Sequence, residues 1–264
     1  MTRNKKRHHS LLERREASVV RKPRLQAIWK RPLSKRLASR KHPVTGEPTK
    51  YLWGRIGLDM GGDLVTRLYE NGEPILKENF PQDSRLFPYA IEAVRFLVLL
   101  FEAEYLVIVK NDDDKGVVAR EARETLHNVQ LHDGSKRINF FKETGFLDDR
   151  KHWLVTKHRT QKGGFCKRHL LNFFVDDKAE VGRYLPRNTV FLWFGTEAKE
   201  REEHREALLA RARRGRLKFQ QVTDWKRAVA EILRHYPNWE ECLQGRPQAE
   251  QEEMEMLHNL LMAA

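Results

Sequence analysis

The sequence lacks features that would place it in several common classes of protein. Its 264 residues include only two cysteines, far apart at Cys166 and Cys242, which excludes a disulfide framework and a zinc site with closely spaced cysteine ligands. It has no run of about 18 apolar residues, the length needed for a membrane-spanning helix, and no apolar core of a secretory signal. We therefore expect no membrane segment and a reducing intracellular location, in the cytoplasm, nucleus or mitochondrion.

Acidic residues are scarce at the start of the chain. Residues 1–50 hold 16 Lys and Arg against 3 Asp and Glu, whereas the remaining residues hold 34 of each kind, so this segment carries the whole net charge of +13. Large apolar residues are few there and follow no regular period, which predicts a basic tail that is disordered or extended until a partner orders it. Such a polycation favours RNA, DNA or a ribonucleoprotein. The alternative interpretation is a targeting segment.

From Tyr51 onward, short apolar runs alternate with stretches of helical periodicity. The runs predicted as strands are 52–59, 105–109, 152–156, 172–175 and 189–194, and the stretches predicted as helices include 88–101, about 116–129, and 222–236 with Thr223 or Asp224 as its cap. Apolar strands without alternation, separated by helices, are typical of a parallel sheet covered on both faces. The sequence therefore predicts a doubly wound, three-layer α/β/α domain over residues 51–238.

The end of the chain, residues 239–264, has a different pattern. Residues 248–264 carry an apolar stripe at helical spacing, which consists of Met254, Leu257, Leu260 and Leu261. This spacing predicts an amphipathic helix. The helix either packs back on the domain or docks a partner, and both interpretations remain open.

Polar residues follow four of the predicted strands. They are Asp59, Lys110 with Asn111, the segment 157–162, and Asp176 with Asp177. Because parallel strands end at a common edge, these side chains should meet where the strand order reverses. Carboxylates brought together raise each other's pKa unless a cation neutralises them, and Mg²⁺ is the usual partner of oxygen ligands. The alternative is that Asp176 or Asp177 caps a helix over 178–185.

Several motifs occur in an order that resembles a known superfamily. They are IGLDMGG (56–62), FFKETGF (140–146), RTQKGGFCKRHLLNFFVDDKAEV (159–181), VFLWFG (190–195) and VTDWKRAVAEIL (222–233). Together they resemble the haloacid dehalogenase-like (HAD) superfamily of phosphotransferases and hydrolases, and more closely a little-characterised group within it. The resemblance extends from about Arg55 to Tyr236.

This resemblance implies a role for individual residues. Asp59 would be the nucleophile that forms an aspartyl phosphate, and Lys162 would match the lysine that steadies the nucleophile and the transferring phosphoryl group. Asp176 and Asp177 would hold Mg²⁺ together with Asp59 and the main-chain carbonyl of Gly61. The residues expected to contact the substrate phosphate are Gly61, Gly62, Lys110, Asn111 and Arg159.

The sequence departs from the superfamily pattern at two positions. Gly61 stands two residues after Asp59, where the phosphatases usually place an aspartate as general acid, and Asp63 comes two residues later. After the second strand, Lys110 or Asn111 stands where a phosphate-binding Ser or Thr is expected. A missing general acid disfavours poor leaving groups, since this kind of catalysis contributes about 10²–10⁴ in rate.

The intervals between strands bear on the substrate. Only 28 residues (60–87) separate Asp59 from the next predicted helix, and the interval 157–171 is also short. We expect a hairpin over 65–80 but no separate cap domain, and an open site suits a large phosphorylated substrate. Two functions remain open: a Mg²⁺-dependent phosphohydrolase with a nucleic-acid-binding tail, and a catalytically inactive HAD-like scaffold that binds RNA or a ribonucleoprotein.

Overall fold

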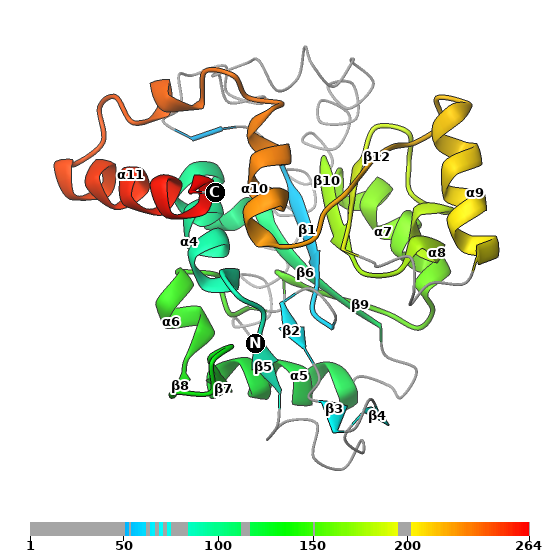
Figure 1. Cartoon of the computed structure of the whole chain (residues 1–264), viewed down its shortest axis with the longest axis horizontal. Coiled ribbons are helices and arrows are strands. Elements are labelled where there is room, and N and C mark those ends of the chain that lie inside the picture. Colours follow the sequence, from blue (N-terminus) through cyan, green and yellow to red (C-terminus); the bar gives the residue numbers. More distant parts are fainter. Residues whose placement is uncertain are drawn as a thin grey trace, which may run out of the picture.

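A computed structural model gives the architecture of the chain (Figure 1). It describes residues 51–52, 54–61, 64–66, 69–70, 73–74, 84–111, 117–149, 151–194 and 202–263. The basic tail, residues 1–50, lies outside the described residues, so its predicted disorder and its predicted partners stay predictions.

A six-stranded parallel sheet forms the centre of the fold. Its strands are β1 (Ile56–Asp59), β6 (Leu106–Asn111), β9 (Trp153–Thr156), β10 (Phe173–Asp176), β11 (Val190–Trp193) and β12 (Lys218–Gln221). They lie in the order β12-β11-β10-β1-β6-β9, so the chain builds outward from β1 through β6 to β9 and returns to β10 on the other side of β1. The predicted parallel α/β fold and all five predicted strands are confirmed. The strand β12 was not predicted, because three of the four residues of KFQQ are polar and it has no apolar run.

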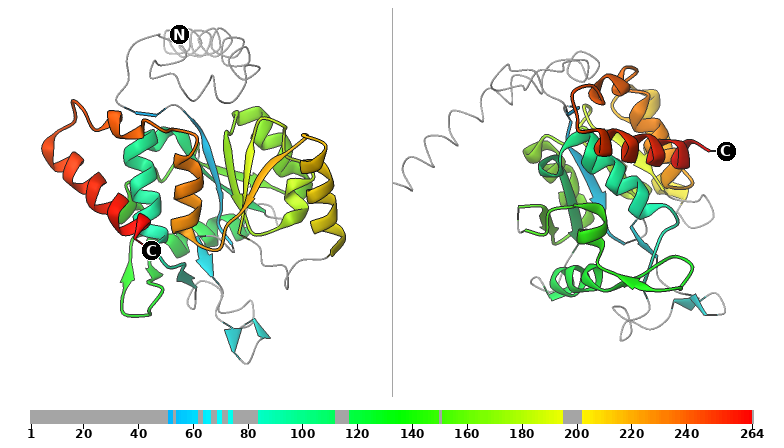
Figure 2. Two further views of the ribbon diagram at one scale, coloured as in Figure 1. Left: turned by 45° about the horizontal axis from the view of Figure 1, so that its top comes forward. Right: turned by 90° about the vertical axis from the view of Figure 1, so that its left-hand side faces the viewer.

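Helices cover both faces of this sheet (Figures 1 and 2). One face carries α4 (Ala90–Phe101), α10 (Trp225–Leu233) and α11 (Gln248–Met262), and the other carries α7 (Lys162–His169), α8 (Ala179–Gly182) and α9 (Glu202–Arg213). The two sides of β1 contribute to different hydrophobic cores. Ile56 and Leu58 pack in the core on the α4 side of the sheet. Gly57 faces the core on the α7 side, where a Cβ on this glycine would lie 2.6 Å from Leu171 and Phe174. The arrangement fits a three-layer α/β/α architecture.

Two of the predicted helices show how local sequence sets their ends. The helix predicted over 222–236 is α10, and the Asp224 side chain caps it by accepting a 2.8 Å hydrogen bond from the backbone N–H of Arg227. The helix predicted from residue 88 is α4, which begins two residues after Pro88 because Tyr89 adopts the left-handed conformation. In both helices the apolar stripe faces the core.

The C-terminal helix α11 packs back on the domain. Its Met254, Leu257 and Leu261 are buried in the same core as α4, while Leu260 of the predicted stripe is exposed. Two hydrogen bonds of 2.7 and 2.8 Å join Arg95 on α4 to Glu253 on α11. The contacts of α11 agree with the interpretation that this helix packs back on the domain. No helix in the described ranges is long and apolar enough to cross a membrane.

A second, small sheet was not predicted. Its strands are β2 (Val65–Thr66), β5 (Arg85–Leu86), β7 (Val129–Gln130) and β8 (Arg137–Ile138), in the order β2-β5-β7-β8, and α5 (Val117–His127) and α6 (Phe140–Thr144) adjoin it in the chain. Strands of two residues have no period that a sequence pattern could reveal. The sheet lies beyond the carboxyl end of β1 (Figure 1). The predicted hairpin is present as β3 (Tyr69–Glu70) paired antiparallel with β4 (Glu73–Pro74).

Candidate active site

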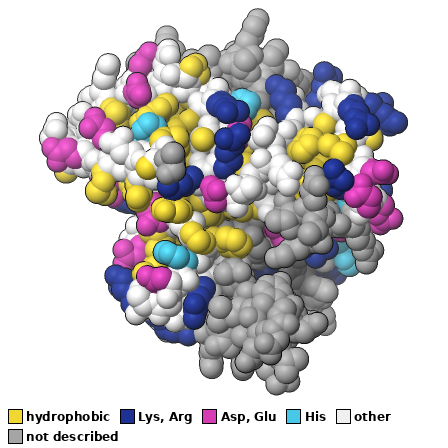
Figure 3. Space-filling view, viewed as in Figure 1, with side chains coloured by type: hydrophobic (Ala, Val, Ile, Leu, Met, Phe, Trp, Pro, Cys, Tyr) yellow, Lys and Arg dark blue, Asp and Glu magenta, His cyan; other side chains and the backbone are white. Residues whose placement is uncertain are grey.

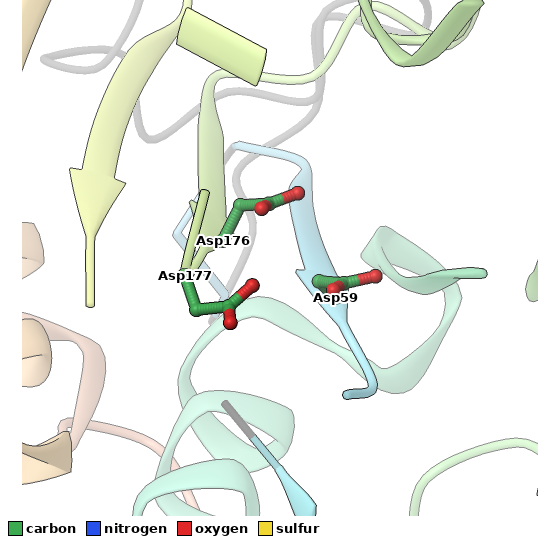
Figure 4. Close-up of side chains that lie close together, drawn as sticks. All are labelled: Asp59, Asp176 and Asp177. Atoms are coloured by element: carbon green, nitrogen blue, oxygen red, sulfur yellow. The ribbon is translucent and has the colours of Figure 1, made fainter. Parts of the chain in front are cut away.

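Three carboxylates meet at the carboxyl edge of the central sheet (Figure 4). Asp59 is the last residue of β1 and Asp176 the last of β10, and the parallel pairing of these strands sets Leu58 beside Val175. One oxygen from each of Asp59, Asp176 and Asp177 lies within 4.8 Å of the others. The predicted convergence of these carboxylates is confirmed, at the point where the strand order reverses.

Lys162 lies between two of these carboxylates. It opens α7, its residue is only 1% exposed, and its Nζ lies 2.8 Å from Oδ1 of Asp59 and 2.6 Å from Oδ2 of Asp176. Burial by itself lowers the pKa of the ammonium, but the charges of Asp176 and Asp59 together outweigh it and hold the pKa above its ordinary value. Lys162 is therefore a fixed positive charge within the acidic cluster, next to Asp59.

Asp176 is the most enclosed of the three aspartates. It is fully buried, and its second oxygen, Oδ1, accepts a 2.9 Å hydrogen bond from the backbone N–H of Lys178. Burial raises its pKa to about 7, because Lys162 offsets this only in part and the charges of Asp59 and Asp177 add to it. Lys178 is the N-cap residue of α8 and makes no side-chain cap bond, so Asp176 stabilises the turn before the helix rather than capping it.

Asp177 is held from two sides. Its carboxylate lies 2.8 Å from Nζ of Lys178, and its main-chain carbonyl accepts a 3.1 Å hydrogen bond from the indole N–H of Trp193. Burial raises the pKa of Asp177, while the charge of Lys178 acts in the opposite direction. Lys178 was not among the site residues predicted from the sequence, although its position directly after two aspartates was a signal.

The donor set fits a hard divalent cation. All three groups are carboxylates, and oxygen donors of this kind are what Mg²⁺ prefers. Both oxygens of Asp176 are already engaged by Lys162 and Lys178, and the side chain has no exposed surface, whereas the side chains of Asp59 and Asp177 are 10% and 20% exposed. Asp59 and Asp177 are thus the residues that would hold such an ion directly. Asp176 is buried next to them and hydrogen-bonded to Lys162 and Lys178.

The residues expected to bind phosphate do not form one cluster among the described residues. Lys110 approaches the loop after β1, since a Cβ built on Gly61 would lie 3.4 Å from its Nζ. Arg159 follows β9, and its guanidinium lies 3.4 Å from the carboxylate of Glu180 on α8. Gly62 and the side chain of Asn111 lie outside the described residues.

A close approach of two backbones positions Lys162. A methyl group on Gly163, the next residue of α7, would lie 2.0 Å from the carbonyl oxygen of Tyr184, whereas one on Gly164 would meet nothing within 4 Å. We expect Gly163→Ala to lower the free energy of unfolding by at least about 2 kcal/mol, within the range for overpacking. Gly164→Ala should leave it unchanged or raise it by up to about 1 kcal/mol. Urea unfolding of both variants measures the difference, and equal effects would refute this close packing.

The buried carboxyl of Asp176 gives the stability of the metal-free chain a pH dependence. Its pKa of about 7 in the folded chain exceeds the ordinary value of 3.8, so the folded chain holds this proton more tightly than the unfolded chain. The resulting contribution to stability is complete below about pH 4 and is lost as the pH rises through 7. We expect Asp176→Asn to gain stability relative to the parent between pH 5 and pH 8, measured by urea unfolding without metal. A difference that stays constant across this range would contradict the expectation.

Comparison of the chain with family models, with curated proteins and with solved structures finds no match in any of the three.

Proposed function

We propose that the chain is a Mg²⁺-dependent phosphohydrolase of the HAD-like kind, with Asp59 as its nucleophile. The observation that supports this most strongly is the convergence of Asp59, Asp176 and Asp177 beside a buried lysine at the reversal point of the sheet. Ligands of open α/β sheets bind at such points, beyond the carboxyl ends of the strands. Perturbed titratable groups in the same place are typical of functional sites.

In the proposed reaction, a carboxylate oxygen of Asp59 attacks the phosphorus of the substrate. The bond from phosphorus to the leaving oxygen breaks, and water then hydrolyses the aspartyl phosphate to release phosphate and restore the carboxylate. Lys162 holds one oxygen of Asp59 at 2.8 Å, which orients the nucleophile and places a positive charge beside the transferring group. A bound Mg²⁺ would neutralise charge on the phosphoryl oxygens.

The surroundings of Asp59 favour certain leaving groups. Gly61 has no side chain to protonate the leaving oxygen, so aryl and acyl phosphates, whose leaving groups need little protonation, suit the site best. Lys110, whose Nζ would lie 3.4 Å from a Cβ on Gly61, is the residue that we propose binds a phosphate oxygen. In the described ranges, the segments between β1 and α4 and between β6 and β9 contain strands of two residues together with α5 and α6. We take these elements to be too few for a separate cap domain, so the substrate we propose is a phosphorylated macromolecule.

A second candidate function is a catalytically inactive scaffold of the same fold that binds RNA or a ribonucleoprotein. Gly61 favours it, because the usual general acid is missing. The contacts of Lys162 also favour it, because this lysine pairs with two of the carboxylates, as in a structural buried ion pair.

Hydrolysis of an activated aryl phosphate by the full chain separates the two candidates. The reaction is followed with Mg²⁺ and with excess EDTA, for the parent and for Asp59→Asn. Turnover that requires both Mg²⁺ and Asp59 supports the phosphohydrolase. Turnover that is absent in the parent, or equal in the parent and the variant, rejects it in favour of the scaffold.

A further inference from the structure

The sheet has a second edge, at the amino ends of its strands, opposite to the carboxylates. The strands β10, β11 and β12 begin in register, with Phe173 beside Val190 and Val190 beside Lys218. Since adjacent strands are about 4.8 Å apart, the residues that precede these three strands lie side by side. They are the end of α7, the loop after α8 and the end of α9.

These three segments carry an excess of positive charge. The exposed cations that form this amino-edge patch are Lys167, Arg168, Arg187, Arg213, Arg214 and Arg216. Residues 164–175, 181–194 and 207–223 contain no Asp or Glu. Among the described residues, none of the six cations forms an ion pair, so the patch is not neutralised from within.

The charge is visible on the surface of the molecule. In Figure 3, Lys and Arg side chains gather at the upper right, over the end of α9 from which β12 begins, and acidic side chains lie at the other end of that helix. Nearby groups respond to the same field. Burial lowers the pKa of His169, and the positive charges of Arg55 and Arg168 lower it further. Burial also lowers the pKa of Arg211, and the charge of Arg216 adds to this effect.

Helix ends account for only part of this charge. Cations in the last turn of a helix interact favourably with its dipole. Arg211 of α9 also donates hydrogen bonds to the carbonyl of Gly182, at the end of α8, and to that of Leu185. Arg187 lies in a loop, however, and Arg216 follows the end of α9. The backbone N–H of Arg216 bonds to the carbonyl of Arg211 at the end of α9, but neither guanidinium lies in the last turn of a helix, so the patch exceeds what the helix dipoles require.

We propose that the amino-edge patch binds the phosphate backbone of a nucleic acid. Five of its six cations are arginines, which bind phosphate oxygens in pairs. A lipid surface is disfavoured, because Tyr184 is the only exposed large apolar side chain in the described parts of these segments, and interfacial binding needs buried apolar area. The basic tail joins the domain at the same edge, where the N–H of Leu52 donates a 2.8 Å hydrogen bond to Leu100 at the end of α4.

The position of the patch separates binding from chemistry. β1 has four residues, so Ile56 at its start and Asp59 at its end are about 10 Å apart. A phosphate bound at the amino edge cannot reach Asp59. The nucleic acid held there acts as an anchor for the domain, and this inference does not depend on the proposed hydrolysis.

Salt-dependent binding of a labelled single-stranded oligonucleotide tests the proposal in the full chain. The patch variant Arg187→Gln/Arg214→Gln/Arg216→Gln is compared with a control of equal charge change, Lys136→Gln/Lys142→Gln/Lys151→Gln, whose lysines are exposed elsewhere. We expect the patch variant to bind at least about tenfold more weakly and its salt slope to fall by about 2, at about 0.7 for each lost phosphate contact. The control should keep the parent slope, and so should Asp59→Asn. A patch variant that matches the control overturns the proposal.

A footprint on the unaltered chain covers the case in which the triple variant does not fold. Lysine acetylation, followed by mass spectrometry, should be suppressed by the oligonucleotide at Lys167 and Lys218 but not at Lys136 or Lys142. Equal protection at all four lysines, or protection of Lys167 by anionic phospholipid vesicles but not by the oligonucleotide, overturns the proposal.

Discussion

Replacing Lys162 with Met is expected to lower the free energy of unfolding by about 3–5 kcal/mol, the usual cost of removing one member of a buried ion pair. Met keeps most of the volume of the lysine stem. It removes the charge that lies 2.8 Å from Asp59 and 2.6 Å from Asp176, so two enclosed carboxylates lose their counter-charge. Urea unfolding of the full chain at pH 8 without metal measures the loss.

The neighbouring lysine provides a matched control for this experiment. Lys178→Met also removes a cation from an aspartate, but the Lys178 side chain is 35% exposed, and solvent limits the expected loss to about 1 kcal/mol. Adding Asp176→Asn to Lys162→Met should recover part of the stability, because the amide carries no charge. Equal losses in the two lysine variants would show that Lys162 is not the cation that stabilises this cluster.

Replacing Asp59 with Asn is expected to abolish hydrolysis of an activated aryl phosphate, a loss of at least about 10⁴-fold in kcat by comparison with other lost nucleophiles. Asn has the shape of Asp, but its amide cannot attack phosphorus to give an aspartyl phosphate. The substitution also removes one of three mutually repelling carboxylates, so the fold should persist. Initial rates at saturating Mg²⁺ for the parent and the variant give the ratio.

The variant Asp177→Asn tests whether the loss of activity expected for Asp59→Asn comes from the loss of the nucleophile or from the loss of a metal-binding carboxylate. It keeps Asp59 and Lys162 in place and removes only one carboxylate that would hold the ion. We expect it to retain measurable turnover but to need a higher Mg²⁺ concentration than the parent. If Asp59→Asn kept the parent rate, or if Asp177→Asn lost activity at every Mg²⁺ concentration, the roles assigned to the two residues would be wrong.

The local sequence pattern was sufficient to predict the strands that are buried along their length. The apolar runs that became β6, β10 and β11 have no alternation, because both of their faces are covered, and this is visible in the sequence. The small sheet was not visible, because β5 pairs with β7 across a gap of more than 40 residues and each of its strands has only two residues. Strands of two residues are stabilised by pairing with strands elsewhere in the chain, and their own residues show no pattern that predicts this pairing.

The chain by itself determined the order of strands and helices, the concentration of positive charge in residues 1–50, and the presence of an acidic residue at the end of β1 and of β10. Only the tertiary structure decided that Lys162 is buried between Asp59 and Asp176, that Lys178 holds Asp177, and that cations from three separate segments share the opposite edge. Charges interact according to their distance and their exposure to water, and both depend on how parallel strands far apart in the sequence are brought into register.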